Sequence, residues 1–153
     1  MGRQSLAQSS EQAQVPGASS QSVHDGLTPR HAAAGLRWLF DRYRRWGLSM
    51  SDLATLLGGL STRRLYDWKR HVETKDEIEI PRDTLERISL LLGIHKALTL
   101  ITPDGHEEEA YAMFQRPLDL FGLQGRSVRD FLLEDGSIGA MYSVRRSLDG
   151  MRA

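Results

Sequence analysis

The sequence contains no cysteine, which excludes a disulfide framework, a cysteine-ligated zinc finger and a thiol nucleophile. It also lacks a long hydrophobic run. The longest apolar stretch, residues 88–101, is interrupted by polar residues and a glycine, whereas about 20 apolar residues are needed to cross a bilayer. The amino-terminal end has no apolar segment of the kind found in a secretion signal. From these absences we expect a cytoplasmic protein with no membrane association.

An excess of charge of either sign is absent too, because 20 basic and 20 acidic side chains cancel. The two signs of charge are nevertheless unevenly distributed along the chain. Residues 30–75 hold ten basic and four acidic side chains, a net charge of +6, whereas residues 76–153 hold nine basic and fourteen acidic ones, a net charge of −5. A basic segment can concentrate a polyanion such as nucleic acid, although a solvated face of a small helical domain can have the same composition.

Large apolar side chains are nearly missing from residues 1–27, which are rich in Gln, Ser, Ala and Gly. Such a segment cannot bury enough apolar surface to offset its loss of chain entropy, so we expect a disordered tail. The remaining length suits one ordinary domain or two very small ones. We expect a helix-turn-helix domain over residues 28–80 and a second helical domain over residues 81–153.

Helical periodicity dominates the chain after the tail. Thr28 is a good N-cap and Pro29 suits a first helical turn, from which apolar residues at intervals of three and four continue to Trp46. Gly47 can then adopt the left-handed conformation that ends a helix. Similar signals predict six further helices, at about residues 49–57, 62–71, 81–98, 106–114, 128–133 and 137–148. No segment alternates with a period of two, so we expect an all-α fold.

Two of these helices form a candidate helix-turn-helix. Residues 52–57 precede a Gly58-Gly59-Leu60 turn, and a capped basic helix follows. Ala54 is small where the two helices would approach. The side chains that remain for an outward, DNA-binding face are Ser61, Thr62, Arg63, Arg64, Tyr66, Lys69 and Arg70. Arginine can bind guanine edges through two hydrogen bonds, and Ser, Thr and Lys can bind phosphates.

The spacing of this segment departs from the usual helix-turn-helix pattern, which has one residue fewer between the alanine and the core positions of the following helix. The double glycine either accommodates the extra residue within the turn or displaces the basic helix from the position in which it could contact bases in a DNA groove. The sequence leaves both alternatives open. Two solvated helices of an ordinary bundle are the other interpretation.

The predicted helix that begins at Pro81 has more apolar surface than one small bundle needs. The residues of this stripe are Leu85, Ile88, Leu91, Leu92 and Leu98. An exposed apolar stripe indicates an association surface, and paired helix-turn-helix units would match a two-fold operator. We therefore expect a homodimer through this stripe, the alternative being complete burial within one chain.

The carboxy-terminal half carries several motifs in a fixed order. Arg116-Pro117 is followed by Gly125-Arg126-Ser127 with Asp130, and the end of the chain contains Val144 and Leu148-Asp149. In this order the motifs resemble the toxin-binding domain of the Xre–MbcA–ParS antitoxins. The resemblance extends over about residues 30–153 and includes an Xre-like helix-turn-helix. Each motif also has a folding role, since Ser127 is a good N-cap and Asp130 suits the positive end of a helix.

The resemblance implies that residues 81–153 form a dimerisation and toxin-binding domain. Antitoxins of this family neutralise toxins of the RES fold, which degrade NAD, by covering the entrance to the toxin's active site, and the complex commonly represses its own operon. The implied toxin-binding residues are Phe131, Tyr142, Arg145, Arg146, Leu148, Met151 and Arg152. Their cationic members suit a pocket that holds a dinucleotide's phosphates, and a frayed terminus is the alternative.

Patterns of catalytic or metal-binding residues do not stand out. His106 and Glu109 share a helix face, but two ligands are too few for a metal site. His95, on an apolar helix side, is interpreted as a core or interface histidine. We expect no enzyme activity, cofactor or metal. The rivals to an antitoxin are a stand-alone helix-turn-helix transcription regulator, whose carboxy-terminal half dimerises or senses a ligand, and a structural adaptor.

Overall fold

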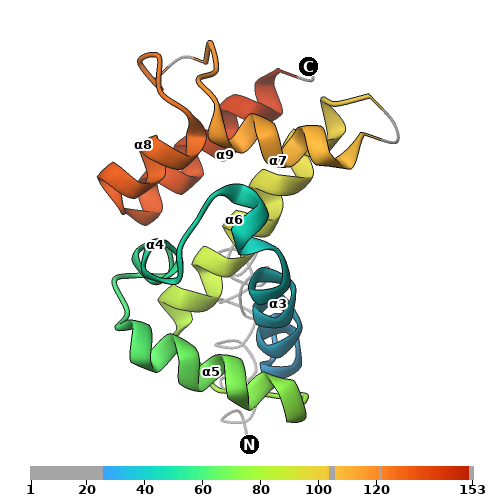
Figure 1. The fold of residues 1–153 in the computed structure, drawn as a ribbon, viewed down its shortest axis with the longest axis vertical. Coiled ribbons are helices and arrows are strands. Elements are labelled where there is room, and N and C mark those ends of the chain that lie inside the picture. The colour runs from blue at the N-terminus through green and yellow to red at the C-terminus, as the bar shows by residue number, and fades with distance from the viewer. Residues whose placement is uncertain (1–25, 104–105, 121, 152–153) are drawn as a thin grey trace, which may run out of the picture.

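The computed structural model describes residues 26–103, 106–120 and 122–151. Within these ranges the chain is all-helical and has no strand, as the periodicity predicted. The predicted tail lies outside them apart from Gly26 and Leu27, and so does Arg152. The helices follow one another in the predicted order (Figure 1).

The amino-terminal half consists of α3 (Pro29–Arg42), the 3-10 helix η1 (Tyr43–Trp46), α4 (Met50–Leu56) and α5 (Thr62–Thr74). The hydroxyls of Thr28, Ser49 and Ser61 cap the three α-helices by accepting hydrogen bonds from backbone amides. Gly47 ends η1 with a φ of 75°, in the left-handed region that favours glycine. The first predicted helix is therefore an α-helix that tightens into a 3-10 turn before it ends.

The carboxy-terminal half consists of α6 (Arg82–Leu100), α7 (Glu107–Gln115), α8 (Val128–Asp135) and α9 (Ile138–Gly150). Ser127 and Ser137 cap α8 and α9, and their hydroxyls accept from the amides of Asp130 and Ala140 at 3.0 and 3.1 Å. Gly136 ends α8 with a φ of 71°, so α9 can begin after a short turn. The predicted N-cap Ser127 is confirmed, and α9 begins within one residue of its predicted start.

α6 is the central helix. It packs against α3 and also against α7 and α9 (Figure 1). Its buried residues are Thr84, Arg87, Ile88, Leu90, Leu91, Ile94, His95, Ala97 and Leu98. A helix with one apolar stripe covers one neighbour, whereas α6 buries side chains toward several. The prediction of a single apolar side on this helix therefore described only part of its buried surface.

One hydrophobic core runs through both halves of the described chain. Trp46 of η1 stacks on Phe114 of α7 with ring centroids 5.0 Å apart, and Leu36 of α3 and Leu148 of α9 are both fully buried in the same cluster. The core thus crosses the boundary expected between residues 80 and 81. α5 and the α8–α9 pair lie at opposite ends of the molecule, and α6 runs between them (Figure 1).

Candidate functional sites

The turn between α4 and α5 depends on its two glycines. Gly58 and Gly59 have φ angles of 114° and 78°, which other residues rarely adopt. The amides of Gly59 and Leu60 both donate to the carbonyl of Ala54, at 3.0 and 3.1 Å. The two left-handed glycines and these hydrogen bonds therefore form the turn that connects α4 to α5.

The outward face of α5 presents the predicted DNA-binding side chains to solvent. The exposed ones are Ser61, Thr62, Arg63, Arg64, Tyr66 and Arg70, and Lys69 is half-buried. The opposite face buries Leu65, Trp68 and Val72 in the core. Burial of Val72 explains why α5 continues to Thr74 rather than ending near His71, as predicted.

Several of these cations already have partners. Arg70 forms an ion pair with Asp67, and Lys69 lies 3.4 Å from Glu73. Arg63, by contrast, has no ion pair or hydrogen bond with any residue of the described chain. Arg44 of η1 is close enough to Tyr66 to interact with it electrostatically, so the basic surface includes a residue that sequence periodicity did not assign to it.

Arg87 of α6 joins the α4–α5 turn to the α8–α9 turn. Its guanidinium donates to the carbonyl of Leu56 at 3.3 Å and to the carbonyl of Gly136 at 2.8 Å. The Nε atom lies 2.9 Å from a carboxylate oxygen of Asp83. The neighbouring hydroxyl of Thr84 donates to the carbonyl of Leu57 at 3.3 Å. Two buried polar residues of α6 therefore hold the end of α4.

The predicted toxin-binding residues do not share one exposed surface. Arg146 is exposed and Met151 is 51% exposed, whereas Leu148 is fully buried and cannot contact a partner directly. Phe131 and Tyr142 are half-buried. The assignment of Leu148 was wrong because α9 extends to Gly150 and its inner face carries Leu148 into the core.

Arg145 lies against α6 rather than projecting from the end of the chain. A Cβ atom on Gly93 would lie 1.8 Å from its Nη1 atom, and its Nε lies 3.2 Å from a carboxylate oxygen of Asp149. Gly93 therefore leaves room for this guanidinium where α6 and α9 cross. α9 extends to Gly150, two residues beyond the predicted helix end at about residue 148.

Most of the predicted dimer stripe is buried within the monomer. Ile88, Leu91 and Leu98 are at most 2% exposed, because α6 is covered from several sides. This part of the stripe is therefore not an exposed association surface. Leu85 and Leu92 are only partly buried and line a groove.

The groove has a volume of about 630 Å³ and lies between α3 and α6. Its apolar lining includes Trp38, Leu85 and Leu92. The two helices approach closely at Gly35, where a Cβ atom would lie 2.8 Å from Cγ2 of Ile88. A side chain at this glycine position would therefore force the helices apart.

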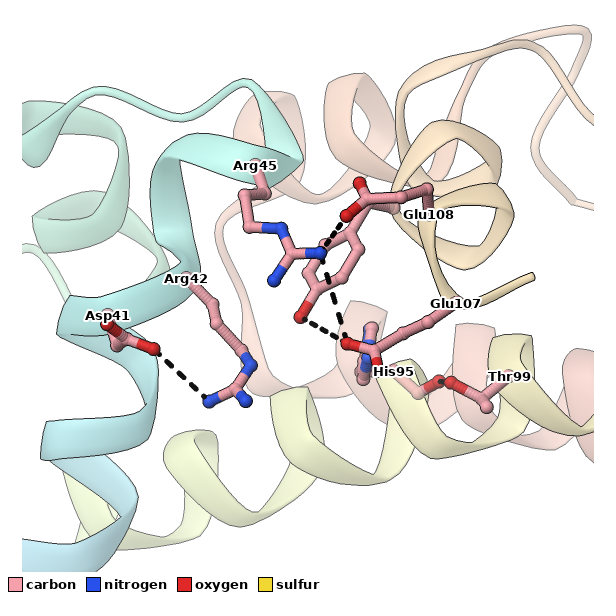
Figure 2. Close-up of polar contacts among 8 residues, drawn as sticks. Asp41, Arg42, Arg45, His95, Thr99, Glu107 and Glu108 are labelled. Atoms are coloured by element: carbon pink, nitrogen blue, oxygen red, sulfur yellow. Dashed lines mark hydrogen bonds and ion pairs between the residues drawn. The ribbon is translucent and has the colours of Figure 1, made fainter. Parts of the chain in front are cut away.

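Charged and aromatic side chains gather at one end of the groove (Figure 2). Arg42 and Arg45 extend from α3 and η1, and Glu107 reaches toward them from α7. The Glu107 carboxylate lies 4.0 Å from Arg45 and 3.5 Å from the Tyr111 hydroxyl, and Arg45 also pairs with Glu108. The Arg42 guanidinium lies 4.7 Å from the ring centroid of Trp38.

His95 lies beside these groups and is only 8% exposed. Its ring centroid is 5.1 Å from that of Trp38, 5.6 Å from that of Trp46 and 4.6 Å from that of Tyr111. No hydrogen-bond partner for its Nδ1 atom, or for the indole nitrogen of Trp46, is found in the described part of the chain. The expectation of a core histidine is confirmed by its burial, and His95 also lines the groove.

Burial perturbs three titratable side chains. It lowers the pKa of His95, and the charges of Arg42 and Arg45 act in the same direction while Glu107 opposes them. Burial likewise raises the pKa of Tyr111. Tyr142 donates a hydrogen bond to Glu86, and this bond, together with burial, raises its pKa to about 12. At neutral pH the imidazole is therefore uncharged and both phenols are protonated.

Sequence reasoning missed the groove because its residues come from distant parts of the chain. Trp38 and Arg42 do not belong to the apolar series of residues 36, 39, 40, 43 and 46 that the periodicity identifies. A tryptophan four residues before an arginine was the available signal, since side chains at that spacing share a helix face.

The described residues include no group of three or more His, Asp or Glu side chains that could hold a metal ion. None of their helices is both long and apolar enough to span a membrane.

The fold and these surfaces define an all-helical protein with a basic helix at one end and an apolar groove between α3 and α6. The chain is 37% identical over 108 residues to the uncharacterized protein y4oB of Sinorhizobium fredii (strain NBRC 101917 / NGR234), and the alignment covers 71% of this chain and 76% of that protein. The chain belongs to the same family as y4oB. No family model and no solved structure matches the sequence.

Proposed function

We propose that this chain is the antitoxin of a type II toxin–antitoxin system. In this proposal it acts in the cytoplasm, binds and neutralises a RES-fold toxin that degrades NAD, and represses its own operon by binding operator DNA. The proposal includes a homodimer within a toxin–antitoxin hetero-oligomer. The chain itself performs no catalysis, because neutralisation and repression are both binding functions.

The observation that carries the proposal is that the exposed side chains of α5 and those at the end of α9 lie apart on one shared core. α5 lies at one end of the molecule and the α8–α9 pair at the other (Figure 1). The basic side chains Arg63, Arg64 and Arg70 of α5 are exposed, and so are Arg146 of α9 and Met151, which follows it. A protein with two partners, DNA and a toxin, requires two such surfaces. The motifs that resemble the Xre–MbcA–ParS antitoxins indicate which partners these are.

The DNA-binding part is tested by replacing Arg63 and Arg64 with Ala. Both side chains are exposed, so we expect the fold to be retained while affinity for a duplex carrying the promoter of its own operon falls about tenfold or more. Wild-type affinity should also decrease steeply with salt, because each phosphate contact releases counterions. Gel-shift titrations at two salt concentrations measure both effects. Unchanged binding by the double variant would contradict the assignment of α5.

The neutralising part is tested by co-expression with the RES-fold protein encoded beside the gene. We expect Arg146→Glu combined with a stop after Asp149 to restore toxicity and NAD loss, because both changes alter the exposed end of α9 without removing the buried Leu148. The Arg63→Ala, Arg64→Ala variant is the matched control and should still neutralise. Full protection by a folded α9 variant would rule out this surface as the toxin contact.

A transcription regulator that senses a ligand is the second candidate. It is favoured by the groove between α3 and α6, which is large enough for a small molecule. A regulator of this kind would bind DNA but would have no neighbouring toxin gene, so the co-expression experiment separates the two functions.

A further inference from the structure

The α3–α6 groove has the general composition of a small-molecule site. Its volume of about 630 Å³ falls within the range of known ligand pockets, roughly 300–1,000 Å³. Trp38, Leu85 and Leu92 are only partly buried along it, so apolar surface remains in contact with water. Ligand sites in helical proteins commonly lie between packed helices and combine apolar walls with a few polar groups.

The polar end of the groove favours a negatively charged group. Arg42 and Lys96 both line it, and Lys96 is exposed without an ion pair or hydrogen bond to any described residue. Glu107 is the one carboxylate among the described lining residues, and Arg45 and Tyr111 already contact it. Arg42, which also approaches the Tyr111 hydroxyl, and Lys96 are therefore the two lining cations that an incoming anion can contact.

The same end already holds a carboxylate of the chain itself. Glu107 sits between a guanidinium and a phenol at the long distances of 4.0 and 3.5 Å (Figure 2). A guanidinium binds carboxylates particularly well, because its planar fork can donate two parallel hydrogen bonds. Arg42, which faces this cluster in Figure 2, contacts the neighbouring Asp41 at 3.6 Å, and the Asp41 side chain is 75% exposed. Such an exposed pair is weak and would not prevent Arg42 from binding another carboxylate.

His95 provides a second, independent indication of a ligand. The imidazole is 8% exposed, lines the groove and has no partner for Nδ1 in the described chain. Buried polar atoms normally have a hydrogen-bond partner, and an exception calls for an explanation. A ligand atom at this end of the groove would supply the missing partner after a small rotation of the ring.

We propose that the α3–α6 groove binds a small amphipathic carboxylate, whose acid group pairs with Arg42 and Lys96 and whose apolar body lies between Trp38 and Leu92. The class includes medium-chain fatty acids and aryl carboxylates, which share the charged head and the apolar body. The binding site does not overlap the exposed face of α5 or the end of α9, so this inference does not depend on the antitoxin proposal.

The test uses the full chain and decanoate as the probe, with 1-decanol as the uncharged analogue of equal length. We expect saturable binding of decanoate with one site per chain, followed by tryptophan fluorescence because Trp38 lines the groove. Binding of 1-decanol should be at least tenfold weaker, because the alcohol cannot pair with the two cations. A Trp38→Phe variant should lose the fluorescence change while retaining the binding measured by calorimetry.

Three variants locate the site. Arg42→Gln and Lys96→Gln should each weaken decanoate binding at least fivefold and leave 1-decanol unaffected. Arg63→Gln, which removes the same charge from α5, is the matched control and should change neither. Lys96 is exposed, so its variant keeps the test valid if Arg42→Gln is poorly folded.

Several results would overturn the proposal. They are the absence of saturable decanoate binding, equal affinity for 1-decanol, and an equal loss of affinity in Arg42→Gln and Arg63→Gln. Light scattering provides a further test of the oligomeric state. If the wild type is a dimer that does not bind decanoate, and Leu92→Glu is a monomer, a second copy of the chain occupies the groove.

Discussion

At the residue scale, the surroundings of His95 determine its chemistry. Three aromatic rings lie within 5.6 Å of its ring centroid, and burial lowers its pKa. The charged groups that influence it come from α3, η1 and α7: Arg42 and Arg45 oppose protonation, and Glu107 favours it. Because burial has the largest effect, the neutral imidazole is the stable form in the folded chain.

The lowered pKa of His95 predicts a pH dependence of stability. The unfolded chain takes up a proton near the ordinary value of 6.5, before the folded chain does. This group's contribution to stability should therefore be complete above pH 6.5, decline as the pH falls below it, and stop declining below the folded-state pKa. The slope for one group is at most about 1.4 kcal/mol per pH unit.

Urea titrations between pH 7.5 and 4.5 measure this slope. His95→Gln should reduce it, because glutamine does not titrate. Identical slopes in the wild type and the His95 variant would contradict the assignment.

At the element scale, α6 performs a task that its amphipathic pattern does not reveal. Arg87 and Thr84 are 9% and 2% exposed and bond to carbonyls at the end of α4. Arg87 also donates to the carbonyl of Gly136, between α8 and α9. One side chain therefore fixes two turns that are far apart in the sequence.

Arg87→Met should destabilise the fold by about 2–4 kcal/mol, because it leaves two carbonyls without their donor. Arg87→Lys should recover only part of this loss, since one ammonium cannot reproduce the forked guanidinium. Arg63→Met, at an exposed position of α5, is the control and should change stability by no more than about 0.5 kcal/mol. Chemical denaturation gives all three values. Equal effects at positions 63 and 87 would show that the Arg87 bonds contribute little.

At the scale of the whole molecule, the two halves share one core. Phe114 of α7 is fully buried and stacks on Trp46 of η1. Further bonds cross between the halves: Gln115 donates to the carbonyl of Arg45 at 2.7 Å, and Arg129 donates to that of Gly47 at 3.2 Å. The halves should therefore unfold together.

Phe114→Ala tests this cooperativity. The cavity should lower the free energy of unfolding by about 3–5 kcal/mol. The shift should appear equally in tryptophan fluorescence, which reports on residues 38, 46 and 68, and in far-ultraviolet circular dichroism, which reports on all helices. Two separated transitions would mean that the halves are independent domains.

Local signals in the sequence were sufficient to predict the helices. Thr28, Ser61 and Ser127 cap helices as expected, because a hydroxyl that accepts from a nearby amide acts within a few residues. Left-handed Gly47 likewise ends its helix. The all-α class and the buried face of α5 follow from the same short-range patterns.

Tertiary packing alone decided which apolar and charged side chains are accessible. Ile88 and Leu148 are apolar side chains that the sequence assigned to contacts with another chain, yet both are buried in the core. Trp38 and Leu92, by contrast, line an open groove. The sequence determined that these side chains lie on helices, since helix formation depends on neighbours three and four positions away. Their burial depended on which other helix lies opposite, and that is set by contacts between residues far apart in the chain.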